Sequence, residues 1–594
     1  MQMNSSAVIQ MVNGPVVKAS GMANYKMREM VTVGSKMLIG EVISLDGDIG
    51  TIQVYEETEG LQVGEEVAST GRPLSLKLGP GLLGNIFDGI ERPLHTINSL
   101  CADFIPEGIG LISIDLEKEW HVEMDMELEV GDEVKGGQVF GKVQETSLIE
   151  HRLMMPSNIE GKVVEKQESG SYNIETVLLK IKDKKGKIHD VKMYQEWPVR
   201  VPRPVEERMV LSRPLVTGQR ILDIFFPIAK GGTAAIPGGF GTGKTMTQHQ
   251  LAKWSDADII VYIGCGERGN EMTDVLEEFP KLIDPKTDKP IMERTILIAN
   301  TSNMPVAARE ASIYTGITLA EYYRDMGYHV AIMADSTSRW AEALREISGR
   351  LEEMPAEEGY PAYLPSRLAE FYERAGYVKS LCGVEASVTI IGAVSPAGGD
   401  FSEPVTENTK RFVNAFLALD KKLAYARHYP SINWLTSYSG YIKILSPWYT
   451  ENVSGNIIEL RNEMISILFE ENKLADIVAL VGEDVLPDDQ RLIIEISKVL
   501  KIGFLQQNAF HSEDTYVPLP KQHLMLEMIK YLYDRAKEAI NLGVPISKVK
   551  DEELFGKVMK MKYTIPNEDL KGIGRLRQEV EDYYNDLIVQ YAES

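Results

Sequence analysis

One eight-residue stretch, Gly238-Gly-Phe-Gly-Thr-Gly-Lys-Thr245, constrains the fold more than any other part of the sequence. It fits the pattern G-x-x-x-x-G-K-[ST] of a phosphate-binding loop, in which glycines let backbone N–H groups surround an anion. The flanks argue against a chance match, because Thr233–Pro237 predicts a buried strand before the loop and Met246–Trp254 predicts a helix after it. In such a loop Lys244 reaches the outer phosphates and Thr245 offers its hydroxyl to Mg²⁺, at the positive end of the helix. The predicted nucleotide-binding residues are therefore Gly238, Gly239, Phe240, Gly241, Thr242, Gly243, Lys244, Thr245 and Met246.

Length and charge limit the class of protein. At 594 residues the chain is too long for one core, and we expect about three or four domains. Its 63 lysines and arginines against 87 aspartates and glutamates give a net charge of −24, which argues against an extended nucleic-acid surface. Three widely separated cysteines predict neither disulfides nor a metal site. Because neither a signal pattern nor an apolar run of about 20 residues is evident, we expect a cytoplasmic protein that serves a membrane only through partners.

The order of strand-like and helix-like patterns predicts a multidomain α/β protein. We assign residues 1–75 to an N-terminal β-barrel, 76–200 to a linker and a β-rich, sandwich-like insertion, 201–444 to a RecA-like phosphate-loop nucleotide-binding domain, and 445–594 to a helical C-terminal domain. In the third segment, apolar strands alternate with helical stretches, which is typical of a largely parallel sheet. Its strands are predicted at 259–264, 295–299, 329–334 and 387–393, and its helices at 244–254, 270–279, 304–326 and 337–351. Helical stripes in the fourth segment lie at 457–468, 487–506, 521–541 and 570–591.

The β-rich insertion has a pattern similar to that of biotin and lipoyl carrier domains. Such a carrier needs a modifiable lysine at a hairpin tip, and Lys192 is the only candidate. No turn residues follow it in Tyr194–Val199, so we interpret the insertion as structural.

Two carboxylates at predicted strand ends extend the phosphate site. His329–Asp335 is an apolar strand that ends in an acid, as expected for a group that holds Mg²⁺ through its hydration shell, although such an Asp is often a helix cap. Glu267 lies just past another predicted strand, at the edge where open α/β sheets bind ligands, and it can polarise the water that attacks a γ-phosphate. A plain ion pair with Arg268 is the alternative, and Glu271 is disfavoured because it lies farther from the strand end.

Aromatic residues late in the chain are candidates for the wall of a purine pocket. Tyr429 and Phe510 lie at predicted loop or element ends, where a ring can stack on adenine. Composition does not decide between this role and ordinary packing.

Three longer motifs resemble the catalytic A subunit of V-type and A-type rotary ATPases. They are Gly264-Cys-Gly-Glu-Arg-Gly-Asn-Glu-Met272, Asn300–Gly316 and Ala334–Ala343. The resemblance covers nearly the full length, including the β-rich insertion, which distinguishes the chain from flagellar or secretion ATPases and from the F-type β subunit. The intact Gly243-Lys-Thr245 distinguishes it from the non-catalytic B subunit.

The resemblance implies a role for each residue singled out above. It assigns phosphate contacts to Lys244 and Arg268, Mg²⁺ contacts to Thr245 and, through water, to Asp335, activation of the attacking water to Glu267, and the adenine pocket to Tyr429 and Phe510.

The resemblance also implies an assembly. Three such chains would alternate in a ring with three B subunits, each donating an arginine finger, while the C-terminal helices surround a central shaft. Peripheral-stalk subunits and a membrane rotor that moves H⁺ or Na⁺ would hold the chain at the inner face of the cell membrane. Because the finger contributes about 10³–10⁵ in rate, we expect the isolated chain to bind ATP and hydrolyse it slowly.

The sequence departs from the family pattern in places. The family's loop usually carries proline where Gly239 stands, and glycine adds freedom that binding must freeze, at about 1 kcal/mol. The stretch 382–387 is shorter and less charged than its counterpart, and Ala397 and Gly440 replace larger residues. A diverged nucleotide-binding structural subunit with impaired turnover is therefore the alternative function.

Two further classes are disfavoured. A GTPase would carry the base-reading motif Asn-Lys-x-Asp, but Asn472-Lys473 is followed by Leu474 and Ala475. A nucleic-acid translocase would need a basic channel, which a net charge of −24 does not favour.

Overall fold

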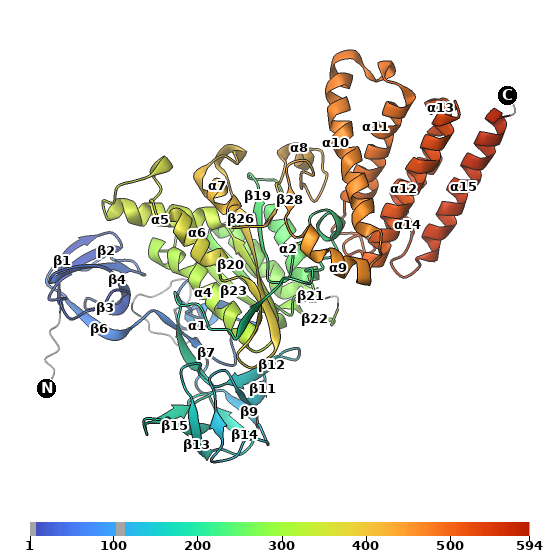
Figure 1. Cartoon of the computed structure of the whole chain (residues 1–594). Helices are drawn as coiled ribbons and strands as arrows, with labels where there is room; N and C mark the ends of the chain where they lie inside the picture. Colours follow the sequence, from blue (N-terminus) through green and yellow to red (C-terminus); the bar gives the residue numbers. More distant parts are fainter. Residues whose placement is uncertain (1–6, 102–107, 109–112, 285, 593–594) are drawn as a thin grey trace. The chain divides into compact units, whose positions relative to one another are not determined.

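The computed structural model describes residues 7–101, 108, 113–284 and 286–592 (Figure 1). The chain divides into two compact units. The first comprises residues 1–210, 231–233 and 257–412, and the second comprises residues 211–230, 234–256 and 413–594.

The first unit begins with the predicted β-barrel, which is closed in the strand order β1-β2-β5-β4-β3-β6. Its strands are β1 (Ala7–Asn13), β2 (Val16–Ser20), β3 (Glu29–Val33), β4 (Leu38–Asp46), β5 (Ile49–Val54) and β6 (Glu66–Pro73). Along β1, Ala7 and Ile9 are buried while Val8 between them is exposed, because successive side chains of a strand point to opposite faces. The interior is filled by aliphatic side chains such as Val31 and Val42.

The β-rich insertion follows as two four-stranded antiparallel sheets, in the orders β12-β11-β9-β14 and β10-β13-β15-β16. Their strands are β9 (Glu119–Met124), β10 (Glu133–Val134), β11 (Val139–Gln144), β12 (Glu150–Met154), β13 (Gly161–Lys166), β14 (Gly170–Asn173), β15 (Leu179–Lys182) and β16 (Ile188–Val191). Lys192 comes directly after β16, and its ammonium group pairs with the carboxylate of Glu175. It is not at a hairpin tip.

A mainly parallel sheet forms the centre of the first unit, in the order β26-β24-β20-β23-β8. Its strands are β8 (Ile86–Phe87), β20 (Ile259–Glu267), β23 (Thr295–Thr301), β24 (His329–Asp335) and β26 (Glu385–Val394). Strand β25 (Gly376–Lys379) pairs antiparallel with β26, and β18 (Glu207–Met209) pairs antiparallel with β25. Every residue of β20 is buried, as expected for a parallel strand covered on both faces. Sequence analysis ended this strand at Gly264; it runs on to Glu267 because pairing with β23 continues past a bulge.

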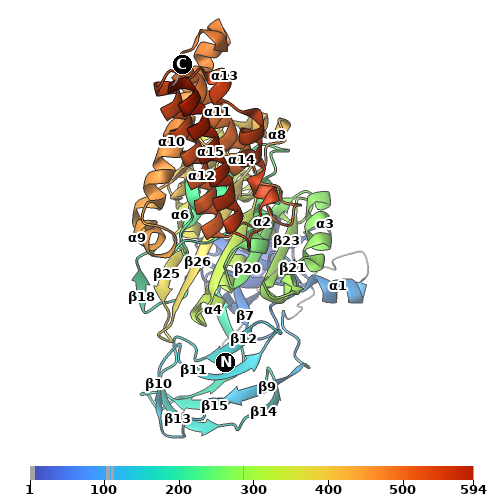
Figure 2. The same ribbon diagram turned by 90° about the vertical axis from the view of Figure 1, so that its right-hand side faces the viewer.

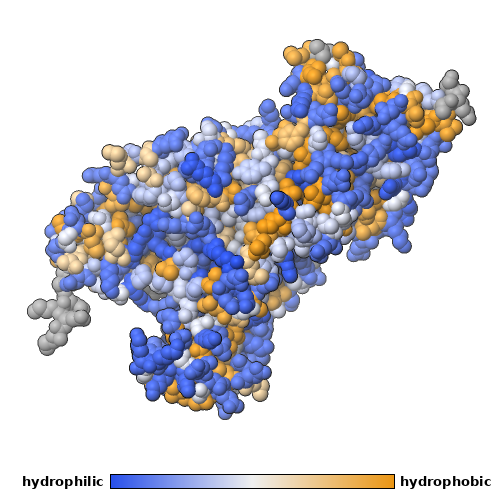
Figure 3. All heavy atoms as spheres, in the orientation of Figure 1, coloured by the Kyte–Doolittle hydropathy of each residue, from blue (hydrophilic) through white to orange (hydrophobic). Residues whose placement is uncertain are grey.

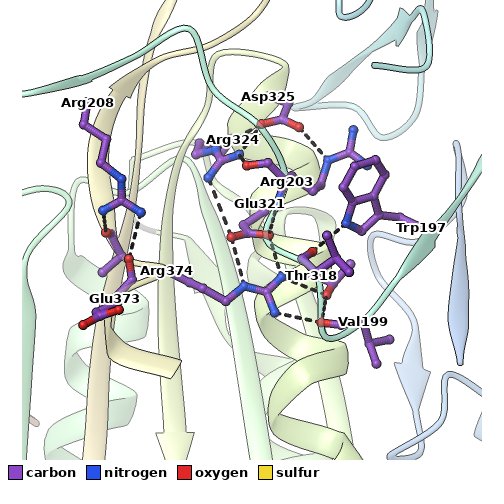
Figure 4. A network of polar contacts seen from close by, with 12 residues as sticks. Trp197, Val199, Arg203, Arg208, Thr318, Glu321, Arg324, Asp325, Glu373 and Arg374 are labelled. Carbon is purple, nitrogen blue, oxygen red and sulfur yellow. Dashed lines mark hydrogen bonds and ion pairs between the residues drawn. The ribbon is translucent and has the colours of Figure 1, made fainter. Parts of the chain in front are cut away.

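Four helices connect and flank these strands: α3 (Gly269–Glu278), α4 (Val306–Asp325), α5 (Thr337–Arg350) and α6 (Leu364–Tyr372). Helix α4 is buried along almost its whole length. Its C-terminal end lies in a network of buried charges shown in Figure 4. There Glu321 accepts a hydrogen bond from Arg374 at 2.6 Å, and Asp325 accepts bonds from Arg203 and Arg324, each at 2.6 Å. Because each buried carboxylate faces a guanidinium, the network fixes this end of the helix.

The second unit holds the strands β19 (Thr233–Pro237, from Ala234 on), β27 (Ala415–Phe416) and β28 (Tyr438–Ser439), and it is otherwise helical. Its helices are α2 (Lys244–Trp254), α8 (Lys421–Tyr425), α9 (Ile442–Asn452), α10 (Ile457–Val481), α11 (Asp488–Leu500), α12 (Leu519–Asn541), α13 (Ile546–Val549), α14 (Glu552–Thr564) and α15 (Lys571–Ala592). Both views show α10, α11, α12, α14 and α15 side by side (Figures 1 and 2). Sequence analysis predicted these long helices except α14.

The surface shown in Figure 3 is mixed in character, with hydrophobic residues scattered among hydrophilic ones. Within the residues that the structure describes, no helix has both the length and the apolar character needed to cross a membrane.

Candidate functional site

The predicted phosphate loop lies in the second unit, between β19 and α2. Gly243 caps the helix with φ of +82°, and Gly241 has φ of +76°, both in the left-handed region that glycine adopts without strain. The hydroxyl of Thr242 donates to the carbonyl of Gly239 at 2.7 Å, and the hydroxyl of Thr247 donates to that of Gly243 at 2.9 Å. The loop is thus closed on itself at the N-terminal end of α2, which is the geometry that binds anions.

A pocket of about 960 Å³ opens beside this loop, entirely within the second unit. It is lined by residues from five regions of the chain: Gln219, Leu222, Gly241, Gly243, Met246, Thr247, Gln250, Arg427, Tyr429, Pro430, Ile432, Gln506, Gln507, Asn508, Ala509, Phe510 and Tyr563. The ring of Tyr429 lies against Gly243, since a Cβ built there would approach it to 3.2 Å. Phe510 is 88% exposed, so its ring is available to a ligand. The structure therefore brings both predicted aromatics and the phosphate loop to one pocket.

Buried cations fix the segment that carries Phe510. Arg220, fully buried, donates to the carbonyls of Phe504 and Gln506 and pairs with Asp514 at 2.5 Å. The ammonium group of Lys562, on α14, donates to the carbonyls of Ile502 at 2.6 Å and Gln506 at 2.9 Å. Burial lowers the pKa of Lys562 to about 8. These contacts hold the backbone on either side of Phe510 in place, while the Phe510 ring itself is exposed.

The predicted carboxylates lie in the first unit, at the ends of two neighbouring parallel strands. Glu267 is the last residue of β20 and Asp335 the last of β24, and the register pairs Gly264 with Asp335. Both side chains are buried, with 8% and 1% exposed. The hydroxyl of Tyr262 donates to Asp335 at 3.3 Å; burial, followed by the charges of Asp335 and Glu267, holds the pKa of this tyrosine well above its usual range. The two carboxylates offer hard oxygen ligands at this edge, of the kind that Mg²⁺ prefers.

Arg268 and Cys265 lie close to Glu267 in the sequence, one exposed and the other buried. Arg268 is exposed and caps helix α3, whose Met272 N–H donates to the Arg268 carbonyl at 2.9 Å. Cys265 is buried in β20, and burial raises the pKa of its thiol to about 12, which makes it unreactive.

Sequence reasoning missed several residues of the pocket wall, among them Arg427, Gln507 and Tyr563. They come from segments far apart in the chain, and no local motif marks them. For Tyr429 and Phe510, only the family resemblance favoured an adenine-binding role over ordinary packing.

Models of known protein families match four consecutive stretches of the chain. Residues 218–439 match the nucleotide-binding domain of the ATP synthase alpha/beta family, and residues 9–71 match the β-barrel domain of the same family. Residues 111–200 match the alpha/beta subunit barrel-sandwich domain, and residues 446–550 match the C-terminal domain of V and A type ATP synthase.

Relatives are similar over essentially the full length. The V-type ATP synthase alpha chain 2 of Clostridium tetani is 69% identical over 580 residues, which are 98% of each chain. The V-type ATP synthase alpha chain of Halothermothrix orenii is 61% identical over the whole of both chains. The A subunit of the A-type ATP synthase of Methanopyrus kandleri is 56% identical over 97% of this chain and 98% of its own.

A solved structure shares the fold at much lower identity. The ATPase EscN of the type III secretion system of enteropathogenic E. coli superposes with a TM-score of 0.64 at 20% identity, over 88% of this chain and 99% of that one.

Proposed function

The chain belongs to the family of V-type ATP synthase alpha chains and A-type ATP synthase A subunits, and we propose that it hydrolyses or synthesises ATP within a rotary complex. The observation that carries the proposal is the pair of buried carboxylates, Glu267 and Asp335, that end neighbouring parallel strands in a chain with an intact phosphate loop. A protein that only bound nucleotide would have no need for a second buried acid at this edge.

We propose that the pocket of the second unit binds the nucleotide. Tyr429 and Phe510 would hold adenine between them, since both line the pocket. Lys244 would contact the outer phosphates from the first turn of α2, with loop amides around them.

Mg²⁺ fits the donors that the chain offers. The hydroxyl of Thr245 and the carboxylate of Asp335 are hard oxygen ligands, and Mg²⁺ prefers one or two such protein groups together with phosphate oxygens and water. Thr245 would hold the ion directly and Asp335 through water. The bound ion would supply charge neutralisation between phosphate oxygens.

Glu267 would act as the group that orients and polarises the attacking water. Its burial at a strand end keeps the carboxylate in one place, which is what general-base and water-positioning roles require. Arg268, the next residue, would help to hold the phosphate side.

We propose that the complete site needs a second chain. A non-catalytic B subunit would donate an arginine finger in a ring of three plus three, with central-shaft and peripheral-stalk subunits around it. The finger contributes about 10³–10⁵ in rate, or roughly 4–7 kcal/mol, so robust turnover by a verified isolated monomer would contradict this arrangement.

The remaining proposals concern the assembly. The complex would couple ATP turnover to H⁺ or Na⁺ transport through a membrane rotor, with this chain on the cytoplasmic side of the cell membrane. Residues 1–75, 76–200, 201–444 and 445–594 would be the domains that divide this work. Dependence of hydrolysis on Na⁺ in the whole complex distinguishes the two ions.

The test is Glu267→Gln in the co-expressed complex. The variant should keep nucleotide binding, because the pocket is untouched, and lose about 10²–10⁴ in kcat, because the amide is a poor proton acceptor. Retained turnover would exclude Glu267 as the water-activating residue. A wild-type complex that binds ATP without turnover would instead support the alternative of a structural subunit.

A further inference from the structure

The strand that carries Glu267 contains a bulge one residue before it. Ladder pairing of β20 with β23 matches Cys265 to Asn300 and then Glu267 to Thr301, so Gly266 has no partner. Gly266 has φ of +70°, which favours glycine. A bulge shifts the side chains that follow it relative to an uninterrupted strand, so this one determines where the Glu267 carboxylate points.

The side chain of Arg309, in the first turns of α4, lies directly against the bulge. A Cβ built on Gly266 would come within 2.7 Å of the Arg309 Cδ and 2.9 Å of its Nε. The guanidinium donates from Nη2 to the carbonyl of Ser302 at 2.9 Å and contacts that of Met304 at 3.5 Å. Arg309 therefore fills the space that a side chain at position 266 would need.

These contacts close a cycle that includes Glu267. The N–H of Ser302 donates to the Glu267 carbonyl at 2.9 Å, and the Ser302 carbonyl in turn accepts from Arg309. The carbonyl of Arg309 accepts from the thiol of Cys265 at 3.4 Å, and Cys265 leads back through Gly266 to Glu267. The backbone of Glu267 is thus tied to both the loop after β23 and the start of α4.

The chemistry of Arg309 is unusual for a buried arginine. It is 8% exposed, yet the described part of the chain offers it no ion pair, and its Nε has no acceptor there. At the other end of the same helix, Arg324 and Arg374 each pair with a buried carboxylate (Figure 4). A buried cation that lacks such a partner costs stability. A stabilising role alone would be better served by a paired or apolar side chain.

We propose that Arg309 is a positioning residue for ATP turnover, which braces the Gly266 bulge and so holds the Glu267 carboxylate in its reactive orientation. The inference rests on the proposed role of Glu267. Arg309 acts through backbone contacts on β20 and on the loop after β23.

The test is Arg309→Gln in the assembled complex, measured by steady-state ATP hydrolysis. The variant loses the guanidinium that contacts the carbonyls of Ser302 and Met304 in the loop after β23. We therefore expect kcat to fall about 10- to 100-fold while KM for ATP changes less than about threefold. A loss of function that came only from poor folding would lower the amount of active complex and its melting temperature. Titration of nucleotide-binding sites corrects kcat for that amount.

Arg208→Gln is the matched control. Arg208, on β18, also donates to two loop carbonyls, those of Glu373 at 2.9 Å and Ala375 at 3.4 Å (Figure 4). Strands β25, β26 and β24 separate β18 from β20. We expect its kcat to stay within about twofold of the wild type. Equal kcat per site for the two variants would overturn the proposal.

Gly266→Ala tests the same contact by changing the bulge residue instead of Arg309. The added Cβ would press on Arg309 and strain a backbone with φ of +70°, so kcat should fall by the same order. Because both changes displace one bulge, the double variant should be no worse than about twofold below the poorer single variant. A loss of kcat in the double variant equal to the product of the two single losses would contradict the proposal. If Glu267→Gln itself left turnover intact, the role of Glu267 would fail first, and the Arg309 result would then be read as structural.

Discussion

The two regions proposed to share the work differ in how they meet solvent. In the second unit, Phe240 and Phe510 are 81% and 88% exposed beside an open pocket. In the first unit, Glu267 and Asp335 are 8% and 1% exposed at the ends of paired strands. The region that would recognise the nucleotide is open to solvent, and the region that would react is closed to it.

The difference follows from how each region is built. The pocket draws on the phosphate loop, on residues 219–222 before it, and on three later segments around Tyr429, Phe510 and Tyr563, so the side chains of one segment can be changed without those of the others. The carboxylates end two neighbouring strands of one parallel sheet, where a shift of the pairing by one residue would move every side chain of a strand to the other face. Recognition and chemistry should therefore be separable by mutation.

The largest effect is expected from Lys244→Ala. Loss of a charge-assisted contact to the outer phosphates should weaken ATP binding by about 100-fold, and turnover should fall with it. Isothermal titration of the chain with MgATP measures this. Lys253→Ala, in the last turn of the same helix, is the control and should bind normally. Unchanged affinity of Lys244→Ala would contradict the division between a recognition region and a reactive region, because the loop would then not be the phosphate site.

The second prediction concerns the base of the pocket wall. The pKa of Lys562 is about 8 in the folded chain, below its usual value near 10.5, so the unfolded chain binds more protons between these values. Stability should therefore rise as pH increases from about 8 to 10.5, by up to about 3 kcal/mol from this group.

Lys562→Met tests that statement. The free energy of unfolding, measured by urea titration at pH 8 and pH 10, should rise less with pH in the variant than in the wild type. Lys557→Met, on the same helix but ion-paired at the surface, should leave the rise unchanged. An identical slope in Lys562→Met would mean that this lysine is not desolvated and that the wall is less rigid than its contacts indicate.

The phosphate loop and the carboxylate edge could both be predicted from the sequence. The loop is a local motif, and Glu267 and Asp335 end apolar runs, so parallel pairing brings them to one edge. The bulge at Gly266 was not predictable, because it depends on the register with β23. Tyr563 was missed because its helix, α14, reaches the pocket only through tertiary packing. What depends on distant segments could not be predicted.

A smaller effect is expected from Phe510→Ala. Stacking of one aromatic ring on a base contributes about 1–1.5 kcal/mol, so ATP affinity should fall roughly tenfold while kcat at saturating ATP is kept. Fluorescence titration with a labelled nucleotide measures it. Tyr425→Ala removes an equally exposed ring, 84% accessible, and should change nothing. A fall in kcat without a change in affinity would place Phe510 in the reactive region and reverse the comparison.

The smallest effect is expected at Gly239, where the family usually carries proline. Gly239 does not have a positive φ, and the hydrogen bonds it makes among the described residues use its carbonyl, which a proline would keep. Gly239→Pro should therefore stiffen the loop and tighten nucleotide binding by about 0.4–1 kcal/mol, with slower ADP release. Stopped-flow release of a labelled ADP measures it.

Gly241→Pro is the contrasting variant, because a φ of +76° is closed to proline and binding should be lost. Equal behaviour of the two variants would show that the loop changes conformation when it binds phosphate. The open region would then be shaped by its ligand, whereas strand pairing holds the carboxylate edge.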